Sequence, residues 1–379
     1  MMHSNKRDLF VTRSSLPPLD DFVEEIRPLW DTHIVTNMGE KHRQLQAKVS
    51  EYLGAEHCVL FANGHTALES TLIALDLEGE AITTPFTFAS TTHAIVRAGL
   101  EPVMCDVRLE DGTIDPLKIE ELITERTSVI VPVHVYGNVC DVDAIDAIAS
   151  KHGLKVVYDA AHAFGELVGN RSVASYGDAS MFSLHATKAF NSAEGGIVCC
   201  NGDEGLAKRL NLLKNFGIVD AENVEAVGLN AKMSELHAAM GLCNLRLLPD
   251  QIALRAEAAT RYRQRLGQVD GIRIVAPHAD GNAMSNYSYF TIAMEGRFEG
   301  GRDELHKSLA QQGIHARKYF FPCTNAYACY RDVLDPLATP MAKKLSEQVL
   351  CLPLFAGITE EEVDRVCDAV IEHLLQASS

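Results

Sequence analysis

The sequence predicts an α/β protein: a large domain with a mostly parallel central sheet, followed by a smaller α+β domain. Between about residues 58 and 200, short runs rich in strand-forming residues alternate with helical segments, which is typical of parallel sheets. The chain has 379 residues, more than one hydrophobic core usually supports. The alternation stops near residue 250. We therefore expect a large domain over residues 1–250 and a small C-terminal domain over 251–379.

Seven runs are expected to form the strands of the large domain: residues 58–61, 81–83, 102–107, 128–133, 155–158, 179–184 and 196–200. One crossover can be followed in detail, because Asp141 is suited to cap a helix that Gly153 would end. The strand after this helix delivers Asp159 at its carboxyl end. Ligands of open α/β sheets bind at that end of the strands, so Asp159 is a candidate site residue.

The second region is predicted to contain three helices and a strand. Residues 251–266 and 303–312 have helical character, and residues 289–293 resemble a strand. The last helix begins at Thr359, which forms a capping box with Glu362. Apolar residues then recur at helical spacing, at Val363, Val366, Val370 and Leu374.

The composition and net charge of the chain limit the kinds of molecule that it can bind. Hydrophobic residues make up 47% of the chain and charged residues 22%, as in globular proteins, and the net charge is −17. An acidic protein repels the phosphate backbone, which argues against nucleic acid as a partner. A phosphate group would have to be held by local amides, hydroxyls or single cations.

Cysteine and histidine usage argues against disulfides and metals. The ten cysteines are scattered, mostly in apolar runs, without any Cys-x-x-Cys pair, as expected of reduced thiols in the cytoplasm. The 15 histidines include no His-Glu-x-x-His motif, so no metal site is predicted. No apolar run is long enough to cross a bilayer, and we expect a cytoplasmic protein with no membrane partner.

Lys188 and Asp159 together suggest a cofactor. Lys188 follows one apolar strand and precedes another, and burial there would lower its pKa from the usual value of about 10.4. A neutral amine can form a Schiff base with the aldehyde of pyridoxal 5'-phosphate, while an acid can keep the pyridine nitrogen protonated. Asp159 could alternatively cap the next helix. The pairing predicts a pyridoxal phosphate enzyme.

Three further residues are candidates for holding that cofactor. Gly64 joins a strand to a helix, whose free amides suit a phosphate, although a glycine at such a turn is commonly structural. Phe88 follows the next strand and could stack on a flat ring or simply pack in the core. His162 could donate to the phenolic oxygen of the cofactor or serve as a hydrogen-bonded turn residue.

The chain resembles the pyridoxal phosphate-dependent aminotransferases that act on nucleotide-linked keto sugars, which have the aspartate aminotransferase fold. The resemblance runs from about residue 36 to residue 353. Its most specific parts are Asp159-Ala160-Ala161-His162, residues 183–196 and residues 228–235. This combination of motifs is hard to obtain by chance.

The resemblance implies a role for each motif residue. Lys188 corresponds to the Schiff-base lysine, Asp159 to the partner of the pyridine nitrogen, His162 to the partner of the ring oxygen, Phe88 to the stacking aromatic, and Gly64, His65 and Ser183 to the phosphate site. Asn230 corresponds to a residue that reaches the cofactor phosphate of the other subunit, which implies a homodimer with shared active sites.

Two positions depart from the family pattern. The family more often has threonine where His65 stands, and Thr66 could supply the missing hydroxyl. It more often has a Tyr-Arg pair where Ala231 and Lys232 stand, which weakens any assignment of contacts to that loop.

Within the family, the segments around Asp159, Lys188 and Lys214 most resemble enzymes that make dTDP-4-amino-4,6-dideoxyglucose, a sugar of O-antigen polysaccharides. The resemblance implies dTDP-4-keto-6-deoxy-D-glucose and L-glutamate as substrates. Arg317, Lys318 and Tyr319 are candidates for the nucleotide diphosphate, or form a solvated strand.

This function has three alternatives. An enzyme acting on a 3-keto sugar or on another nucleotide stays open. A sugar dehydratase of the same fold has histidine in place of the lysine, so Lys188 argues against it. A non-catalytic regulator is disfavoured, because the chain has no DNA-binding helix pair and no basic face.

Overall fold

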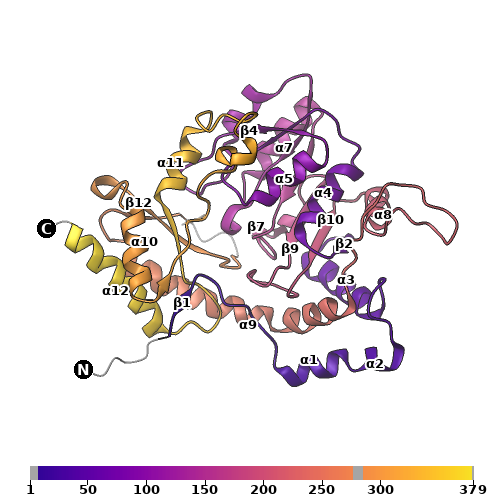
Figure 1. The fold of residues 1–379 in the computed structure, drawn as a ribbon, viewed down its shortest axis with the longest axis horizontal. Helices are drawn as coiled ribbons and strands as arrows, with labels where there is room; N and C mark the ends of the chain where they lie inside the picture. Colours follow the sequence, from indigo (N-terminus) through magenta and orange to yellow (C-terminus); the bar gives the residue numbers. More distant parts are fainter. Residues whose placement is uncertain (1–6, 276–284, 378–379) are drawn as a thin grey trace.

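The computed structural model describes residues 7–275 and 285–377, and its central feature is a seven-stranded sheet (Figure 1). The strands are ordered β2 (His57–Phe61), β10 (Gly196–Cys200), β9 (Ala179–Ser183), β6 (Lys155–Asp159), β5 (Thr127–Val131), β3 (Glu80–Thr83) and β4 (Glu101–Met104). Strand β10 runs antiparallel to both of its neighbours, and the other adjacent pairs are parallel. The predicted α/β class is confirmed.

Helices cover both faces of this sheet. Helices α3 (Glu40–Leu53), α7 (Val142–His152) and the first part of α9 (Glu235–Leu266) share one buried cluster with the sheet. Helices α4 (Gly64–Ala74), α5 (Ala89–Arg97) and α8 (Glu204–Leu213) share the other. Successive strand residues alternate between the two clusters, as Leu60 and Phe61 do, because strand side chains point to opposite faces in turn. The result is a three-layer α/β/α unit.

All seven predicted strands are present in this one sheet. Three end earlier than expected: β4 stops at Met104, β5 at Val131 and β9 at Ser183. Beyond β4 and β5, isolated bridges form at Val107 and Val133. The predicted crossover helix is α7. The Asp141 side chain accepts a hydrogen bond from the Ala144 amide at 3.1 Å, and Gly153 ends the helix with φ of 68°.

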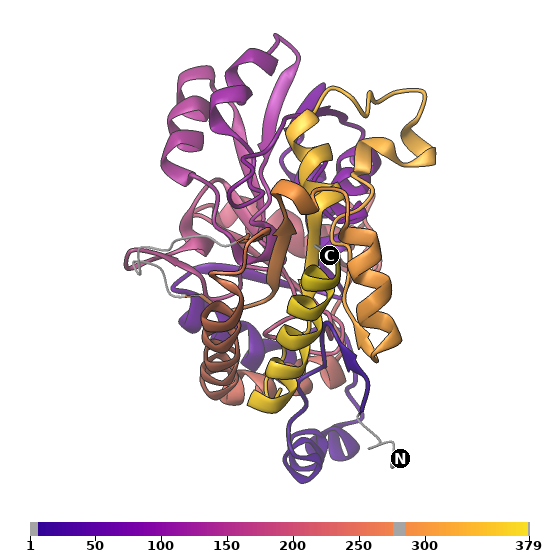
Figure 2. The same cartoon turned by 90° about the vertical axis from the view of Figure 1, so that its left-hand side faces the viewer.

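A second sheet lies in the C-terminal region. It is antiparallel, with the order β11 (Ile272–Ile274), β12 (Phe290–Met294) and β14 (Val349–Leu352). Helices α10 (Arg302–Gln311) and α12 (Glu360–Ala377) and the end of α9 share a core with one of its faces, and Figure 2 shows α10 and α12 side by side. The predicted capping box is present, since Thr359 and Glu362 exchange backbone-to-side-chain hydrogen bonds of 3.1 and 3.2 Å.

The other face of this small sheet packs against the large sheet's edge. Ala293 and Cys351 lie in one cluster with Phe86, Val133 and Tyr136, which follow large-domain strands. The helix predicted over residues 251–266 is the second part of α9, which begins at Glu235, contains Pro249 and runs between the two regions. The division near residue 250 stays a prediction.

The remaining elements are short. Strand β1 (Leu9–Phe10) pairs in parallel with β13 (Ile314–His315), and β7 (Leu167–Val168) pairs with β8 (Arg171–Ser172). The N-terminal helices α1 (Leu19–Ile26) and α2 (Pro28–Thr32) lie at the lower edge of Figure 1, where α1 contacts α9. Two more helices are α6 (Pro116–Ile119) and α11 (Pro340–Gln348). No helix in the described part of the chain has the length and apolar character that a membrane span requires.

Candidate active site

A pocket of about 330 Å³ opens where the strands of the large sheet end. Residues that follow β2, β3, β5, β6 and β9 contribute to it, and residues of the C-terminal region supply one wall. Its lining consists of Asn63, Gly64, His65, Thr87, Phe88, Ser90, Val133, Asp159, Ala161, His162, Met181, Ser183, His185, Thr187, Lys188, Glu194, Tyr289, Tyr319 and Phe320. The parallel topology therefore brings residues that are up to about 260 positions apart in sequence to one edge.

Asp159 is the buried acid of this pocket, with only 4% of its surface exposed. Its Oδ2 accepts a hydrogen bond from the Thr91 hydroxyl at 2.7 Å, and its Oδ1 accepts one from the Ala161 amide at 3.1 Å. Burial raises the pKa of Asp159, while the two donors and the nearby Lys188 oppose that rise. Within the described part of the chain, Asp159 forms no ion pair at 4 Å or less. The carboxyl group can therefore accept a cationic partner from the pocket.

Lys188 stands in the same pocket, in a turn that its own amide closes by donating to the His185 carbonyl at 2.9 Å. Burial lowers its pKa to about 8, and Asp159 partly offsets that shift. Among the described residues, no hydrogen bond or ion pair engages the Lys188 amine. A substantial fraction is therefore neutral near pH 8, and this fraction can act as a nucleophile or a base.

His162 has a defined tautomer. Its Nδ1 accepts a hydrogen bond from the Tyr136 amide at 3.0 Å, so the proton of the neutral ring must lie on Nε2. Burial, reinforced by the nearby Lys188, holds the pKa of His162 well below its usual value. The ring is thus a neutral donor within the pocket. Asn286 and Ser288 fix the segment further by donating to the His162 carbonyl at 2.8 and 2.7 Å.

The start of helix α4 forms one end of the pocket. Asn63 caps the helix by accepting from the Thr66 amide at 2.9 Å, and Gly64 is its first residue. A Cβ atom at Gly64 would lie 3.1 Å from the Ser183 Cβ, so the absence of a side chain allows this close packing. Thr66 does not line the pocket, and its hydroxyl donates to Asn63 instead.

His65 lies beside this helix start. Its Nδ1 is 3.0 Å from the Ser90 hydroxyl, and its Nε2 is 3.5 Å from the Glu69 carboxylate. Ser183 lines the same end of the pocket. Free helix-start amides with two nearby hydroxyls suit an anion, and the phosphate site expected here stays a prediction.

Aromatic side chains form the walls. Phe88 is 60% exposed although it is a large apolar residue, so one of its faces is free to contact a ligand. Tyr289, Tyr319 and Phe320 come from the small-domain side. The Tyr136 hydroxyl donates to the Tyr319 carbonyl, which ties this wall to the large domain.

The three residues predicted for the nucleotide diphosphate separate in space. Tyr319 lines the pocket. Arg317 is exposed and outside the lining, and no hydrogen bond or ion pair to its guanidinium is found within the described residues. Lys318 is also outside the lining and pairs with Asp303 at 2.7 Å. The assignments of Arg317 and Lys318 stay predictions.

Asn230 does not line the pocket of its own chain. It is exposed, and its Oδ1 accepts a hydrogen bond from Lys232 at 3.0 Å. Lys232 also lies over the ring of Phe216, with its Nζ atom 4.8 Å from the centroid. An exposed polar loop outside its own pocket is compatible with the expected contact to a second subunit.

Sequence reasoning missed several contributors. The Thr91 hydroxyl binds Asp159, and the Ser90 hydroxyl lies beside His65. Both residues belong to the run of hydroxyl residues after Phe88, and this run was the only feature of the sequence that could have indicated their roles. Tyr136 acts through its backbone amide on His162, and no side-chain pattern can reveal such a contact.

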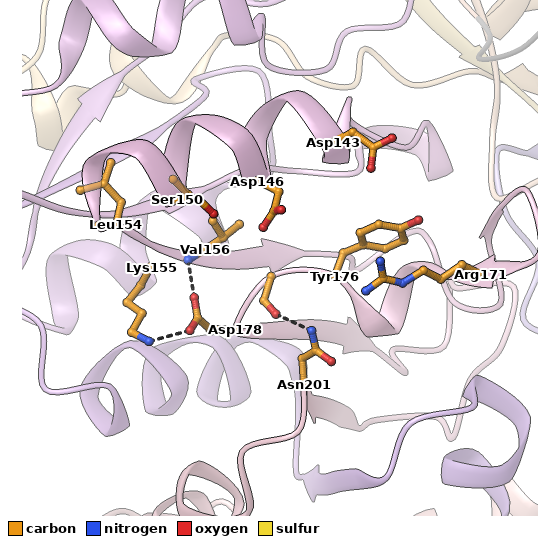
Figure 3. A pocket seen from close by; sticks show the side chains of 13 residues that line it. Asp143, Asp146, Ser150, Leu154, Lys155, Val156, Arg171, Tyr176, Asp178 and Asn201 are labelled. Carbon is orange, nitrogen blue, oxygen red and sulfur yellow. Dashed lines mark hydrogen bonds and ion pairs between the residues drawn. The ribbon is translucent and has the colours of Figure 1, made fainter.

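A second hollow of about 530 Å³ lies between α7 and the opposite ends of the strands (Figure 3). Its Asp178 accepts hydrogen bonds from Lys155 at 2.7 Å and from the Val156 amide at 2.9 Å, and Asn201 donates to the Gly177 carbonyl at 3.1 Å. These polar groups satisfy one another. The hollow lies near the amino end of β6, away from Asp159, so it does not compete as the active site.

The described residues contain no group of three or more His, Cys, Asp or Glu side chains that could hold a metal ion. The fold and the pocket define an α/β enzyme that combines a half-buried lysine and a buried acid at the carboxyl edge of its sheet.

The chain belongs to the DegT/DnrJ/EryC1/StrS aminotransferase family, whose model matches residues 19–371. This confirms the family expected from the sequence, and with it an enzyme of the transaminase class. A similar protein, 42% identical over 97% of this chain and 99% of its own length, is the dTDP-4-amino-4,6-dideoxy-D-glucose transaminase of Shigella dysenteriae.

Solved structures agree with the fold. The crystal structure of DesI in the presence of its TDP-sugar product has a TM-score of 0.90 and 34% identity, covering 98% of this chain and 96% of that one. The PMP-form of the putative sugar aminotransferase Spr1654 from Streptococcus pneumoniae has a TM-score of 0.90 and 25% identity, covering 97% and 100%. The aspartate aminotransferase fold type predicted above is confirmed.

Proposed function

We propose that this enzyme transfers the amino group of L-glutamate to carbon 4 of dTDP-4-keto-6-deoxy-D-glucose, using pyridoxal 5'-phosphate as cofactor. The products are dTDP-4-amino-4,6-dideoxy-D-glucose and 2-oxoglutarate. The observation that carries the proposal is the pocket that Lys188 and Asp159 both line, where neither forms an ion pair at 4 Å or less with a described residue.

The side chains of the pocket fit this cofactor. Asp159 is a buried carboxyl group with a raised pKa, and a protonated ring nitrogen would supply the missing positive charge. The start of α4, with Gly64, His65 and Ser183, offers amides and a hydroxyl to the phosphate. Phe88 has an exposed face for the ring. When bound, the cofactor would supply an electron sink for the carbon from which a proton is removed.

The chain's own residues would divide the remaining work. Lys188 would hold the cofactor covalently between turnovers and would carry a proton to and from the substrate carbon, which its lowered pKa favours. Asp159 would keep the ring nitrogen protonated, and Thr91 would keep Asp159 ionised. His162 would donate its Nε2 hydrogen to the ring oxygen, because its Nδ1 is already an acceptor.

Support for the sugar comes from the relatives. The protein that is 42% identical is named for dTDP-4-amino-4,6-dideoxy-D-glucose, and the DesI structure was determined with a TDP-sugar product. The similarity extends over nearly the whole length of both relatives, which supports a nucleotide-linked sugar as the substrate of this chain. O-antigen synthesis as the pathway, and a cytoplasmic location, remain predictions of the same proposal.

We also propose a homodimer in which Asn230 of each chain completes the other chain's site. Asn230 is exposed and lies outside its own pocket. The nearby Phe216, Ile218, Val224 and Val227 are apolar yet 40% to 99% exposed, as residues covered by a partner often are in an isolated chain.

The test is the visible absorption spectrum of the purified protein with pyridoxal phosphate, taken before and after addition of L-glutamate. We expect a band of the lysine-bound cofactor that glutamate removes and the 4-keto sugar nucleotide restores. The Lys188→Ala variant should fold and lose turnover. A Lys188→Ala enzyme that still transaminates at a substantial rate would contradict the assigned role.

The same experiment separates the alternatives. Restoration by a 3-keto sugar nucleotide alone would keep the enzyme class and change the product. No band after incubation with pyridoxal phosphate would contradict the cofactor and favour a non-catalytic protein.

A further inference from the structure

The turn that carries Lys188 also holds the imidazole of His185 in one orientation. The Thr187 hydroxyl lies 2.8 Å from the His185 Nδ1, and the Thr187 amide donates to the same atom at 3.3 Å. An amide can only donate, so Nδ1 is the acceptor and the hydrogen of the neutral ring lies on Nε2.

The Nε2 side of His185 is available to a ligand. The Glu194 carboxylate lies 3.7 Å from Nε2, which is too far for a hydrogen bond. The His185 and Glu194 side chains are 48% and 52% exposed, and both residues line the pocket that contains Lys188. Apart from the Glu194 carboxylate at 3.7 Å, Nε2 has no acceptor among the described residues, so it can donate a hydrogen bond to a ligand in this pocket.

The other basic side chains of the pocket already have partners or roles. His65 belongs to the phosphate end of the pocket in the proposed function, beside the start of α4. His162 is neutral and belongs to the cofactor in the proposed function, as does Lys188. Among the described residues no arginine lines the pocket. An amino-acid donor brings carboxylates that need a hydrogen-bond donor, and His185 is the basic residue of this lining that is left to supply it.

We propose that His185 binds a carboxylate group of the amino donor through Nε2. This inference rests on the proposed function, since it assigns a residue to the donor half of that reaction. It predicts that His185 contributes to the binding of a dicarboxylic amino acid and not to the loading of the cofactor. The keto sugar brings no carboxylate, so its half of the reaction should depend on His185 much less.

Two substitutions separate binding from a structural role in the turn. His185→Asn keeps a short side chain whose oxygen can accept from the Thr187 amide, as asparagine does in turns, but it lacks the imidazole Nε2. His185→Ala loses both functions. His152→Asn is the matched control, because His152 also lies beside a glutamate, Glu120 at 3.0 Å, on α7 outside the pocket.

The experiment measures each half-reaction and, independently, binding of glutarate to the cofactor-loaded protein by calorimetry. Glutarate has two carboxylates and no amino group, so it reports binding without turnover. A hydrogen bond to a charged group corresponds to roughly ten- to hundredfold in affinity. We expect His185→Asn and His185→Ala to weaken glutarate binding and raise the glutamate concentration for half-saturation by about that factor, with normal cofactor loading and a largely unchanged sugar half-reaction.

The outcomes are distinct. If His185→Asn behaves like wild type while His185→Ala is impaired, His185 only supports the turn and the proposal fails. The proposal also fails if both variants bind glutarate normally, or if both half-reactions fall equally. A wild-type enzyme that loads the cofactor but does not react with glutamate would instead contradict the proposed function.

Discussion

The Thr91 hydroxyl donates a 2.7 Å hydrogen bond to the buried carboxylate of Asp159, and it lies 2.8 Å from the Thr87 hydroxyl. The single hydrogen of Thr91 goes to Asp159, so Thr87 is the donor in the second contact. This chain of hydroxyls stabilises a negative charge that burial otherwise disfavours. Asp159 thus depends on a neighbour that no motif identifies.

Replacing Thr91 with valine should lower kcat while preserving the fold, because valine has nearly the same shape and no hydroxyl. Loss of a hydrogen bond to a charged group costs roughly 1.5–3 kcal/mol, which corresponds to a decrease of about ten- to hundredfold. The pKa of Asp159 should rise further, so the acid limb of the pH profile of kcat should move to higher pH. Steady-state kinetics across pH measures both effects.

Thr91→Ser is the matched control for this substitution, since it restores the hydroxyl and should recover most of the activity. A Thr91→Val enzyme with wild-type kcat and an unchanged pH profile would show that the hydroxyl does not support the charge on Asp159.

Uptake of pyridoxal phosphate by the cofactor-free protein should follow the titration of Lys188. The pKa of this amine is lowered to about 8, so the reactive neutral form accumulates as pH rises through 8, well below the range of an exposed lysine. The uptake rate should therefore rise with pH and level off above about pH 9. Stopped-flow absorbance with Lys188→Ala as a blank provides the measurement.

The Asp159→Asn variant tests how the charge of Asp159 affects the pKa of Lys188. Asp159 raises the pKa of Lys188, so removing its charge should shift the midpoint of uptake to lower pH. A shift to higher pH would contradict the electrostatic coupling of the two residues.

Sequence reasoning was most successful where a pattern is local. The alternation of strands and helices, the Asp141 cap and the Thr359–Glu362 capping box depend on residues close together in the chain. The pocket residues that follow strand ends could also be anticipated, because the parallel topology brings the carboxyl ends of the strands to one edge of the sheet.

The parts that sequence could not give depend on contacts between distant segments. Tyr289 and Phe320 reach the pocket only because the small sheet packs on the large one. Lys318 pairs with Asp303, whereas its neighbour Tyr319 lines the pocket, and the sequence does not show which side of this segment faces Asp303. The helix predicted from residue 251 begins at Glu235 because tertiary packing overrides the proline at 249.

The shared-site homodimer makes a prediction that mixing of subunits can test. Lys188→Ala removes the catalytic amine, and Asn230→Asp places a negative charge where the partner's phosphate is expected. Each homodimer should be almost inactive. In a mixed dimer, one site carries both changes and the other carries neither, so a statistical mixture should recover about a quarter of wild-type activity.

The mixture should be formed by unfolding and refolding the two variants together, with separately refolded variants as the control. If Asn230 acted on its own chain's site, each site of the mixed dimer would carry one change, and mixing would restore no activity. Cofactor content measured on the same samples excludes a difference in loading.

Acid should destabilise the protein through His134. This histidine is fully buried, accepts a hydrogen bond from the Cys140 amide at 3.1 Å, and stacks on Tyr158 at 4.7 Å between ring centroids. Burial lowers its pKa to about 3, whereas an unfolded histidine titrates near 6.5. Between these values the unfolded chain binds a proton that the folded protein does not, so the free energy of unfolding falls as pH falls below 6.5.

The His134→Asn variant isolates this contribution, because asparagine can still accept from the Cys140 amide and does not titrate. The variant should be less stable than wild type at pH 7, since it loses the stacked ring. From pH 7 to pH 5, wild type alone loses the roughly 2 kcal/mol that protonating the unfolded His134 confers, so the stability gap should shrink by about that amount. Urea unfolding at the two pH values measures the gap, and a gap that stays constant would mean that His134 is protonated equally in both states.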